Sequence, residues 1–185
     1  KLTRGATVAD IGCGHGSSTI MMAIRYPNST FHGFDFHGPS IEEASQKAQA
    51  SGLNNVEFQE SSAKEIPDKG YDFACIFDAL HDMGDPLGAA KRIREVLAKD
   101  GTFMLVEPMA EDSLQDNLEK NPMSGAYYSF STLECVPTSK SQEVGLQLGS
   151  QAGESRLTEV LNEAGFSLVR LTCENASNLV LEVKY

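Results

Sequence analysis

Short, mainly apolar runs alternate along this chain with segments in which apolar residues recur at helical spacing. The runs predict β-strands and the periodic segments predict helices, because side chains repeat every 2 residues in a strand and about every 3.6 in a helix. The expected strands cover residues 8–11, 30–34, 55–59, 71–77 and 102–106. The expected helices between them cover residues 17–26, 39–51 and 87–97.

The alternation stops at residue 109 and returns at residue 154. Residues 111–120 predict a helix, whereas residues 123–136 mix Met, Tyr, Phe and Leu without a period. An irregular segment of this length is more often functional than accidental, so its side chains either line a substrate pocket or fill ordinary core. Residues 154–164 then predict a helix, and residues 166–171 and 179–183 predict two strands with no helix between them.

Repeated strand–helix units are typical of a parallel sheet with helices on both faces. We therefore expect an α/β, Rossmann-like, doubly wound and mostly parallel seven-stranded sheet with an antiparallel C-terminal strand. No repeat or linker divides residues 1–185, which are expected to form a single domain. The chain lacks an initiator Met and begins almost directly on the first strand, so an N-terminal segment or domain is expected to be missing.

Composition excludes several classes of function. The formal net charge of −11 leaves no basic footprint for nucleic acid. No apolar run is long enough to span a bilayer and no signal-peptide pattern opens the chain, so we expect a cytoplasmic protein without a membrane partner. The four cysteines form no CxxC pair and the four histidines show no metal-site spacing, so neither a disulfide framework nor a metal is expected.

Acidic residues recur where the expected strands end. Asp10, Asp35, Asp78 and Glu107 each stand at the carboxyl end of a strand, the edge at which sheets of this kind bind ligands. After Asp10, glycines stand at every second position, 12, 14 and 16. Such a turn requires residues without a side chain. The spacing differs from the GxGxxG turn that holds a dinucleotide pyrophosphate, which is the simplest competitor.

The GxGxG turn and the acids after it resemble the first motifs of class I S-adenosylmethionine-dependent methyltransferases. The resemblance implies S-adenosylmethionine as cofactor and S-adenosylhomocysteine as product. It implies that Asp35 grips the ribose hydroxyls and that Phe36 lies against the adenosine, while Ser61 or Ser62 stands where many members have an acid for adenine. The implied cofactor-binding residues are Asp10, Gly12, Cys13, Gly14, Gly16, Asp35, Phe36, Ser61, Ser62 and Asp78.

A second segment, Leu80-His81-Asp82-Met83-Gly84-Asp85, resembles the HDW-x-D segment of small-molecule O-methyltransferases, with Met83 in place of the Trp. This resemblance implies that His81 is the general base and that Glu107, at the end of the next strand, orients it. A phenol with a pKa of about 10 is a poor nucleophile at neutral pH, so a base within hydrogen-bond reach assists. The Glu107-Pro108 ending is also similar to the methyltransferase domain of winged-helix/methyltransferase proteins.

We therefore expect an enzyme that moves a methyl group from S-adenosylmethionine to an oxygen of a small-molecule acceptor by direct displacement. Two alternatives stay open, namely N- or C-methyl transfer and a regulatory domain that binds the cofactor without turnover. The oligomeric state also stays open, with a dimer through the missing N-terminal region as one form.

Overall fold

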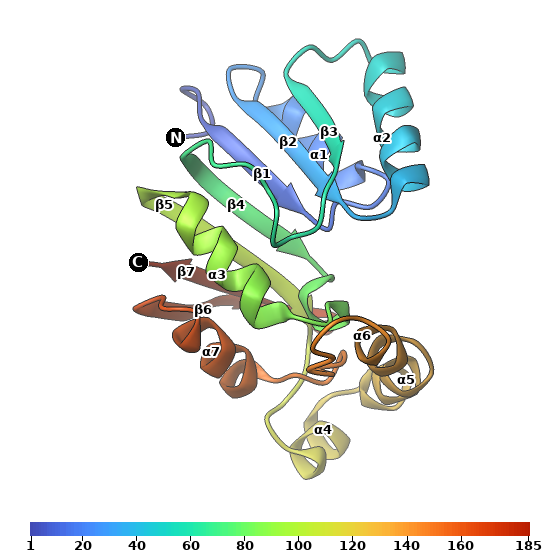
Figure 1. Ribbon diagram of the computed structural model, residues 1–185. Helices are drawn as coiled ribbons and strands as arrows, with labels where there is room; N and C mark the ends of the chain where they lie inside the picture. The colour runs from blue at the N-terminus through green and yellow to red at the C-terminus, as the bar shows by residue number, and fades with distance from the viewer. The chain divides into compact units, whose positions relative to one another are not determined.

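The computed structural model describes all residues, 1–185 (Figure 1). The strands are β1 (Thr7–Ile11), β2 (Thr30–Asp35), β3 (Val56–Glu60), β4 (Tyr71–Phe77), β5 (Leu97–Pro108), β6 (Leu168–Glu174) and β7 (Asn178–Lys184). The helices are α1 (Ser17–Arg25), α2 (Gly38–Ala50), α3 (Pro86–Val96), α4 (Leu114–Lys120), α5 (Ser124–Phe130), α6 (Val136–Lys140) and α7 (Glu154–Glu163). A 3₁₀ turn, η1 (Leu80–Asp82), and a π-helical turn, η2 (Ser131–Cys135), complete the chain.

The seven strands form one sheet of order β3-β2-β1-β4-β5-β7-β6. β1 pairs in parallel with β2 and with β4, and β2 pairs in parallel with β3. β6 and β7 pair antiparallel, as expected for two strands without a crossover helix between them. The predicted α/β class and mostly parallel sheet are confirmed. No helix of the chain is both long and apolar enough to cross a membrane.

The chain divides into two compact units. The first unit comprises residues 1–77 and 92–103, and the second comprises residues 78–91 and 104–185. In the first unit α1 and α2 pack against β2 and β3. β1, β2 and β4 are mainly buried, which is why their sequences are largely apolar rather than alternating. The fully buried residues of these strands include Val8, Ala9, Phe31, Ala74 and Ile76. β3, at the edge of the sheet, is mostly exposed.

The second unit contains the segment whose pattern was irregular in the sequence. Residues 124–140 form one continuous helical run, α5-η2-α6, and α4 precedes it. Ser113 caps α4, since its hydroxyl accepts the Asp116 N–H at 3.0 Å. The helix predicted over residues 154–164 is α7, and it packs against β6.

One boundary differs from the sequence expectation. The Asp100-Gly101 pair predicted a turn before a strand at residue 102, but β5 already begins at Leu97. A Cβ added to Gly101 would lie 2.7 Å from Leu97 Cγ and 2.8 Å from the carbonyl oxygens of Ala98 and Tyr71. Three residues of extended chain span about 10 Å, so the approach of Gly101 to Ala98 shows that the chain turns at Asp100-Gly101, within the bounds of β5.

Candidate active site

The three glycines in the turn after β1 lie in two different surroundings. Gly12, Gly14 and Gly16 have φ angles of 71°, 51° and 74°, a left-handed conformation that side chains disfavour. A Cβ on Gly16 would also lie 2.6 Å from the Phe58 ring, so that residue is bare because the core packs against it. A Cβ on Gly14 would meet nothing within 4 Å. Gly14 therefore borders open space in which a ligand can lie.

Asp10 lies beneath this turn rather than at its surface. Its side chain is 1% exposed, and Oδ2 accepts hydrogen bonds from Ser18 Oγ at 2.6 Å and Thr19 Oγ1 at 2.7 Å. Burial raises the pKa of Asp10, and the two hydroxyl bonds oppose the rise. Oδ1 is buried without a hydrogen-bond partner. In the structure Asp10 therefore holds the first turn of α1, and its contact with a cofactor stays a prediction.

Asp35, at the end of β2, reaches the glycine turn. Its Oδ2 accepts the Gly14 N–H at 2.9 Å, and its Oδ1 accepts the His37 N–H at 2.9 Å. Two predicted site residues from different strand ends are thus brought together. A carboxylate offers about four acceptor positions, so Asp35 can still accept hydrogen bonds from ligand hydroxyls. Phe36 beside it is 71% exposed, which leaves its ring available to cover a flat apolar group.

Three further predicted residues border Asp35 or the turn. The Ser61 N–H donates to the Asp35 carbonyl oxygen at 2.9 Å, which places Ser61 beside the end of β2. The Ser62 hydroxyl donates to Glu65 Oε2 at 2.8 Å, within its own loop. Cys13 is 8% exposed, and burial raises the pKa of its thiol, so its side chain is a packing group.

In the second unit, Asp78 has an unusual backbone. Its φ is 49°, a left-handed conformation, and its N–H donates to the Val106 carbonyl oxygen at 2.9 Å. Its Oδ1 accepts Asn178 Nδ2 at 2.7 Å. Partial burial raises the pKa of Asp78, while His81 and Asn178 oppose the rise. Asn178 was not predicted, because nothing in the sequence marks the first residue of β7 as polar and directed to a carboxylate.

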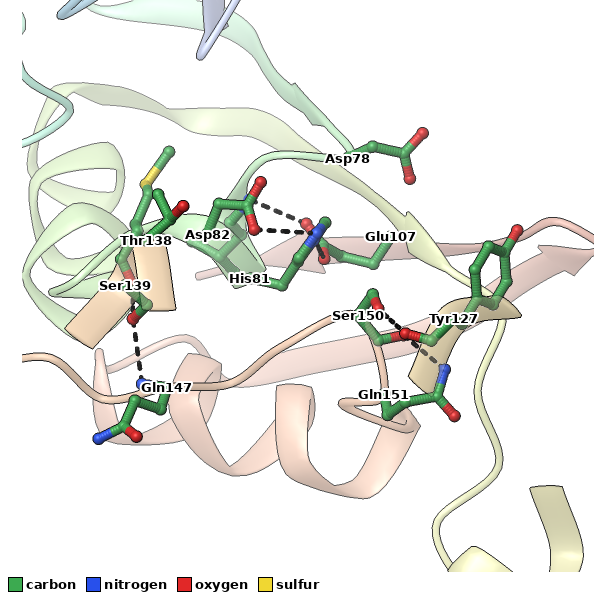
Figure 2. Close-up of polar contacts among 12 residues, drawn as sticks. Asp78, His81, Asp82, Glu107, Tyr127, Thr138, Ser139, Gln147, Ser150 and Gln151 are labelled. Carbon is green, nitrogen blue, oxygen red and sulfur yellow. Dashed lines mark hydrogen bonds and ion pairs between the residues drawn. The ribbon is translucent and has the colours of Figure 1, made fainter. Parts of the chain in front are cut away.

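His81 and Glu107 form a buried pair, with exposed fractions of 5% and 1% (Figure 2). His81 Nδ1 lies 2.6 Å from Glu107 Oε2, and Glu107 Oε1 accepts the Leu80 N–H at 2.9 Å. An ionised carboxylate only accepts hydrogen bonds, so Nδ1 is the donor in this pair. Nε2, on the other side of the ring, lies 3.4 Å from Asp82 Oδ1. The sequence predicted these two residues to act together, and the structure places them in contact.

Burial and the neighbouring carboxylates have opposite effects on the pKa of His81. Burial lowers the pKa of the imidazole, but the hydrogen bond and charge of Glu107, aided by Asp82 and Asp78, outweigh it and raise the pKa. Burial raises the pKa of Glu107 as well, and the bond to His81 opposes that rise.

The irregular segment is docked on the turn that carries His81. The Gly149 N–H donates to the His81 carbonyl oxygen at 3.3 Å, and Ser139 Oγ donates to the Met83 carbonyl oxygen at 2.9 Å. Ser150 Oγ donates to the Tyr127 carbonyl oxygen at 2.9 Å, which ties the segment to itself (Figure 2). These contacts join residues far apart in the sequence, so local patterns could not reveal them.

The family model described as a methyltransferase domain matches residues 2–165. Among curated proteins, the demethylmenaquinone methyltransferase of Listeria monocytogenes serotype 4b is 27% identical over 179 residues, which cover 92% of this chain and 73% of that protein. An S-adenosylmethionine-dependent methyltransferase from Aquifex aeolicus has a similar structure, with a TM-score of 0.73, 18% identity, and coverage of 99% of this chain and 84% of that one.

Mitomycin 7-O-methyltransferase also has a TM-score of 0.73, with 22% identity over all of this chain. This chain spans 50% of the length of that enzyme. At 18% and 22% identity, the similarity to these solved structures shows a shared fold and no more.

Proposed function

This chain belongs to the family of methyltransferase domains and is an enzyme of that class, and from this premise we propose that it methylates an oxygen of a small molecule with His81 as general base. S-adenosylmethionine is the methyl donor in this proposal. The observation that carries it is the buried His81–Glu107 pair, whose 2.6 Å contact engages Nδ1 and leaves Nε2 as the ring nitrogen that would take a proton.

The first unit provides groups that fit this cofactor. S-adenosylmethionine supplies an electrophilic methyl group on a sulfonium, and it also presents a ribose, an adenine and an amino acid. Asp35 has acceptor positions left for ribose hydroxyls, and the exposed Phe36 ring can cover the adenine. The open space at Gly14 admits a ligand against bare backbone. We assign these three residues to cofactor binding.

His81 and Glu107 divide the work of deprotonation. A phenol is protonated at neutral pH, since its pKa is about 10. Nε2 takes the proton from the acceptor hydroxyl as the oxygen attacks, and the ring becomes an imidazolium. Glu107 keeps the proton on Nδ1, which fixes the tautomer, and its charge stabilises the imidazolium. A positioned base of this kind contributes about 10²- to 10⁴-fold to the rate.

Methyl transfer to nitrogen or carbon is the second candidate function. The Listeria relative is named demethylmenaquinone methyltransferase, so a quinone-type molecule is one acceptor to test. His81 would not be required as base for an amine that is already neutral. The two candidates therefore differ in how strongly they depend on His81.

Two measurements test the proposal. Calorimetry with S-adenosylhomocysteine should show binding to the wild type, weaker binding to Asp35→Ala, and unchanged binding to His81→Asn. Methyl transfer should then be measured on a panel of phenols, amines and a reduced quinone. We expect turnover of a hydroxyl acceptor that falls about 10²-fold or more in His81→Asn.

Each contrary result has a separate meaning. Absence of S-adenosylhomocysteine binding would overturn the cofactor assignment. Equal turnover by His81→Asn would refute the base. Tight cofactor binding without turnover on any acceptor would favour a regulatory domain.

A further inference from the structure

Three chemically different side chains meet beside the proposed base. His81 Nε2, a carboxylate oxygen of Asp82 and Cys135 Sγ all lie within 4.8 Å of one another. Asp82 Oδ1 is 3.4 Å from His81 Nε2 (Figure 2). Cys135 is 5% exposed and ends the π-helical turn η2. The proposed methyl transfer uses His81 but gives no role to Asp82 or Cys135.

One oxygen of this cluster accepts no hydrogen bond. Asp82 Oδ1 is buried and accepts no hydrogen bond. His81 Nε2 lies 3.4 Å from it, and when Nδ1 carries the only ring hydrogen, Nε2 directs a lone pair at an oxygen that also has only lone pairs to offer. A buried acceptor without a donor costs free energy, and a cation between the two atoms would remove that cost.

The surroundings favour a positive ion. Asp78, Asp82 and Glu107 all act electrostatically on His81, so three carboxylates surround one imidazole. Glu107 stands behind the ring in the arrangement by which carboxylates orient metal-bound histidines. π-helical turns are rare, and they occur frequently at functional sites. Here η2 places its last residue, Cys135, against Asp82 and His81.

The donor set selects the kind of ion. Nitrogen, sulfur and oxygen donors together suit Zn²⁺, which binds Cys, His and Asp in tetrahedral geometry. Metal–ligand distances of about 2.0–2.3 Å place two tetrahedral ligands about 3.3–3.8 Å apart. The 3.4 Å separation of Nε2 and Oδ1 falls in that range, and the sulfur lies within 4.8 Å of the other two ligand atoms. Three protein ligands leave the fourth position to water.

We propose that His81 Nε2, Asp82 Oδ1 and Cys135 Sγ bind Zn²⁺ or a similar cation, and that the bound ion inhibits methyl transfer by occupying the nitrogen that accepts the proton. A metal–sulfur bond forms as the thiol releases its proton to solvent, and no electron is transferred. Binding is independent of the proposed function, whereas the inhibition rests on it.

The test uses Co²⁺ as a spectroscopic probe and Zn²⁺ as competitor on the whole protein. We expect a thiolate-to-cobalt charge-transfer band in the near ultraviolet, release of the thiol proton, and displacement of the band by Zn²⁺. Cys135→Ser should abolish the band, and Asp82→Asn should weaken binding. Glu107→Gln should weaken it by about 10- to 100-fold. The matched control is Cys173→Ser, which removes an exposed thiol and should keep the band.

The activity arm compares each protein with itself, as the ratio of turnover with Zn²⁺ to turnover with a chelator. The wild type and Cys173→Ser should be inhibited reversibly, and Cys135→Ser should be less sensitive. Absence of a band in the wild type, or a band that survives in Cys135→Ser, would overturn the site. A band without inhibition of an active enzyme would overturn the regulatory part. If no acceptor is turned over, the proposed function fails, while the spectra still decide the metal site.

Discussion

Glu107 holds the ring of His81 and the backbone of the turn that carries it with the same carboxylate. Oε2 contacts His81 Nδ1 at 2.6 Å, and Oε1 accepts the Leu80 N–H at 2.9 Å. The orientation of the proposed base is therefore set before an acceptor arrives, and none of the reaction's free energy is needed to position it. A change at Glu107 should act on the pKa of His81 as well as on the rate.

Glu107→Gln should shift the pH–rate profile toward lower pH. The hydrogen bond and charge of Glu107 raise the pKa of His81 and burial lowers it, so removal of the Glu107 charge should lower that pKa, although Asp82 and Asp78 still raise it. The base works in its neutral form, and the rate rises with pH through the pKa of His81. In the variant this rise should come at lower pH, and the plateau should fall by about 10²-fold or more because the tautomer is less well fixed.

The measurement is kcat/KM across the pH range. Glu182→Gln, which changes the ion pair between Glu182 of β7 and Arg170 of β6, should leave the profile in place. An identical profile for wild type and Glu107→Gln would contradict the coupling of the pair.

Asp10→Asn should change how stability depends on pH. Burial raises the pKa of Asp10 above its ordinary 3.8, so folding favours the protonated acid. The stability that Asp10 contributes is full below 3.8 and is lost as pH rises through the raised pKa. The free energy of unfolding of wild type minus that of Asp10→Asn should therefore fall as pH rises above 3.8. Urea unfolding at several pH values measures it, with the exposed Glu163→Gln as control. A difference that rises with pH would refute the sign.

Gly14→Ala and Gly16→Ala should separate ligand binding from packing. Gly16→Ala adds a Cβ 2.6 Å from Phe58 in a left-handed backbone, so we expect a loss of about 3 kcal/mol or more in the free energy of unfolding. Gly14→Ala meets nothing and should cost about 1–2 kcal/mol of backbone strain. Its larger effect should be on S-adenosylhomocysteine affinity, measured by calorimetry. Equal stability losses in the two variants would contradict this assignment.

Phe36→Ala should weaken cofactor binding without affecting stability. The ring is 71% exposed, so its removal creates no cavity. Loss of one stacking contact worth about 0.5–1.5 kcal/mol corresponds to roughly a 2- to 12-fold higher dissociation constant. Calorimetry measures the dissociation constant, and thermal unfolding measures the stability. Met21→Ala, which removes a 67% exposed side chain on α1, is the control for nonspecific effects. Unchanged affinity in Phe36→Ala would exclude its ring from the site.

The sequence predicted those helices and strands that are marked by their own residues. β4 was recognised because a doubly buried strand must be apolar throughout, and α1 because its glycine turn and apolar period mark its start. The α5-η2-α6 run was missed because its buried positions carry small residues, whereas apolar Phe130 and Leu133 are exposed. The buried residues are Ser124, Ser131, Cys135 and Ser139. At the site, the contact between His81 and Glu107 followed from the resemblance. Cys135 had no signal, because only the fold brings it to Asp82.

The π-helical turn η2 also makes the cluster sensitive to chain length. A π turn accommodates one more residue than an α-helical turn, and each residue turns an α-helix by about 100°. Deleting one residue within Ser131–Cys135 should restore a regular helix and rotate Cys135 away from Asp82, without any ligand being mutated. Related chains can thus gain or lose the cluster by a one-residue insertion or deletion. A comparison of lengths between α5 and α6 would reveal which chains retain it before any of them is purified.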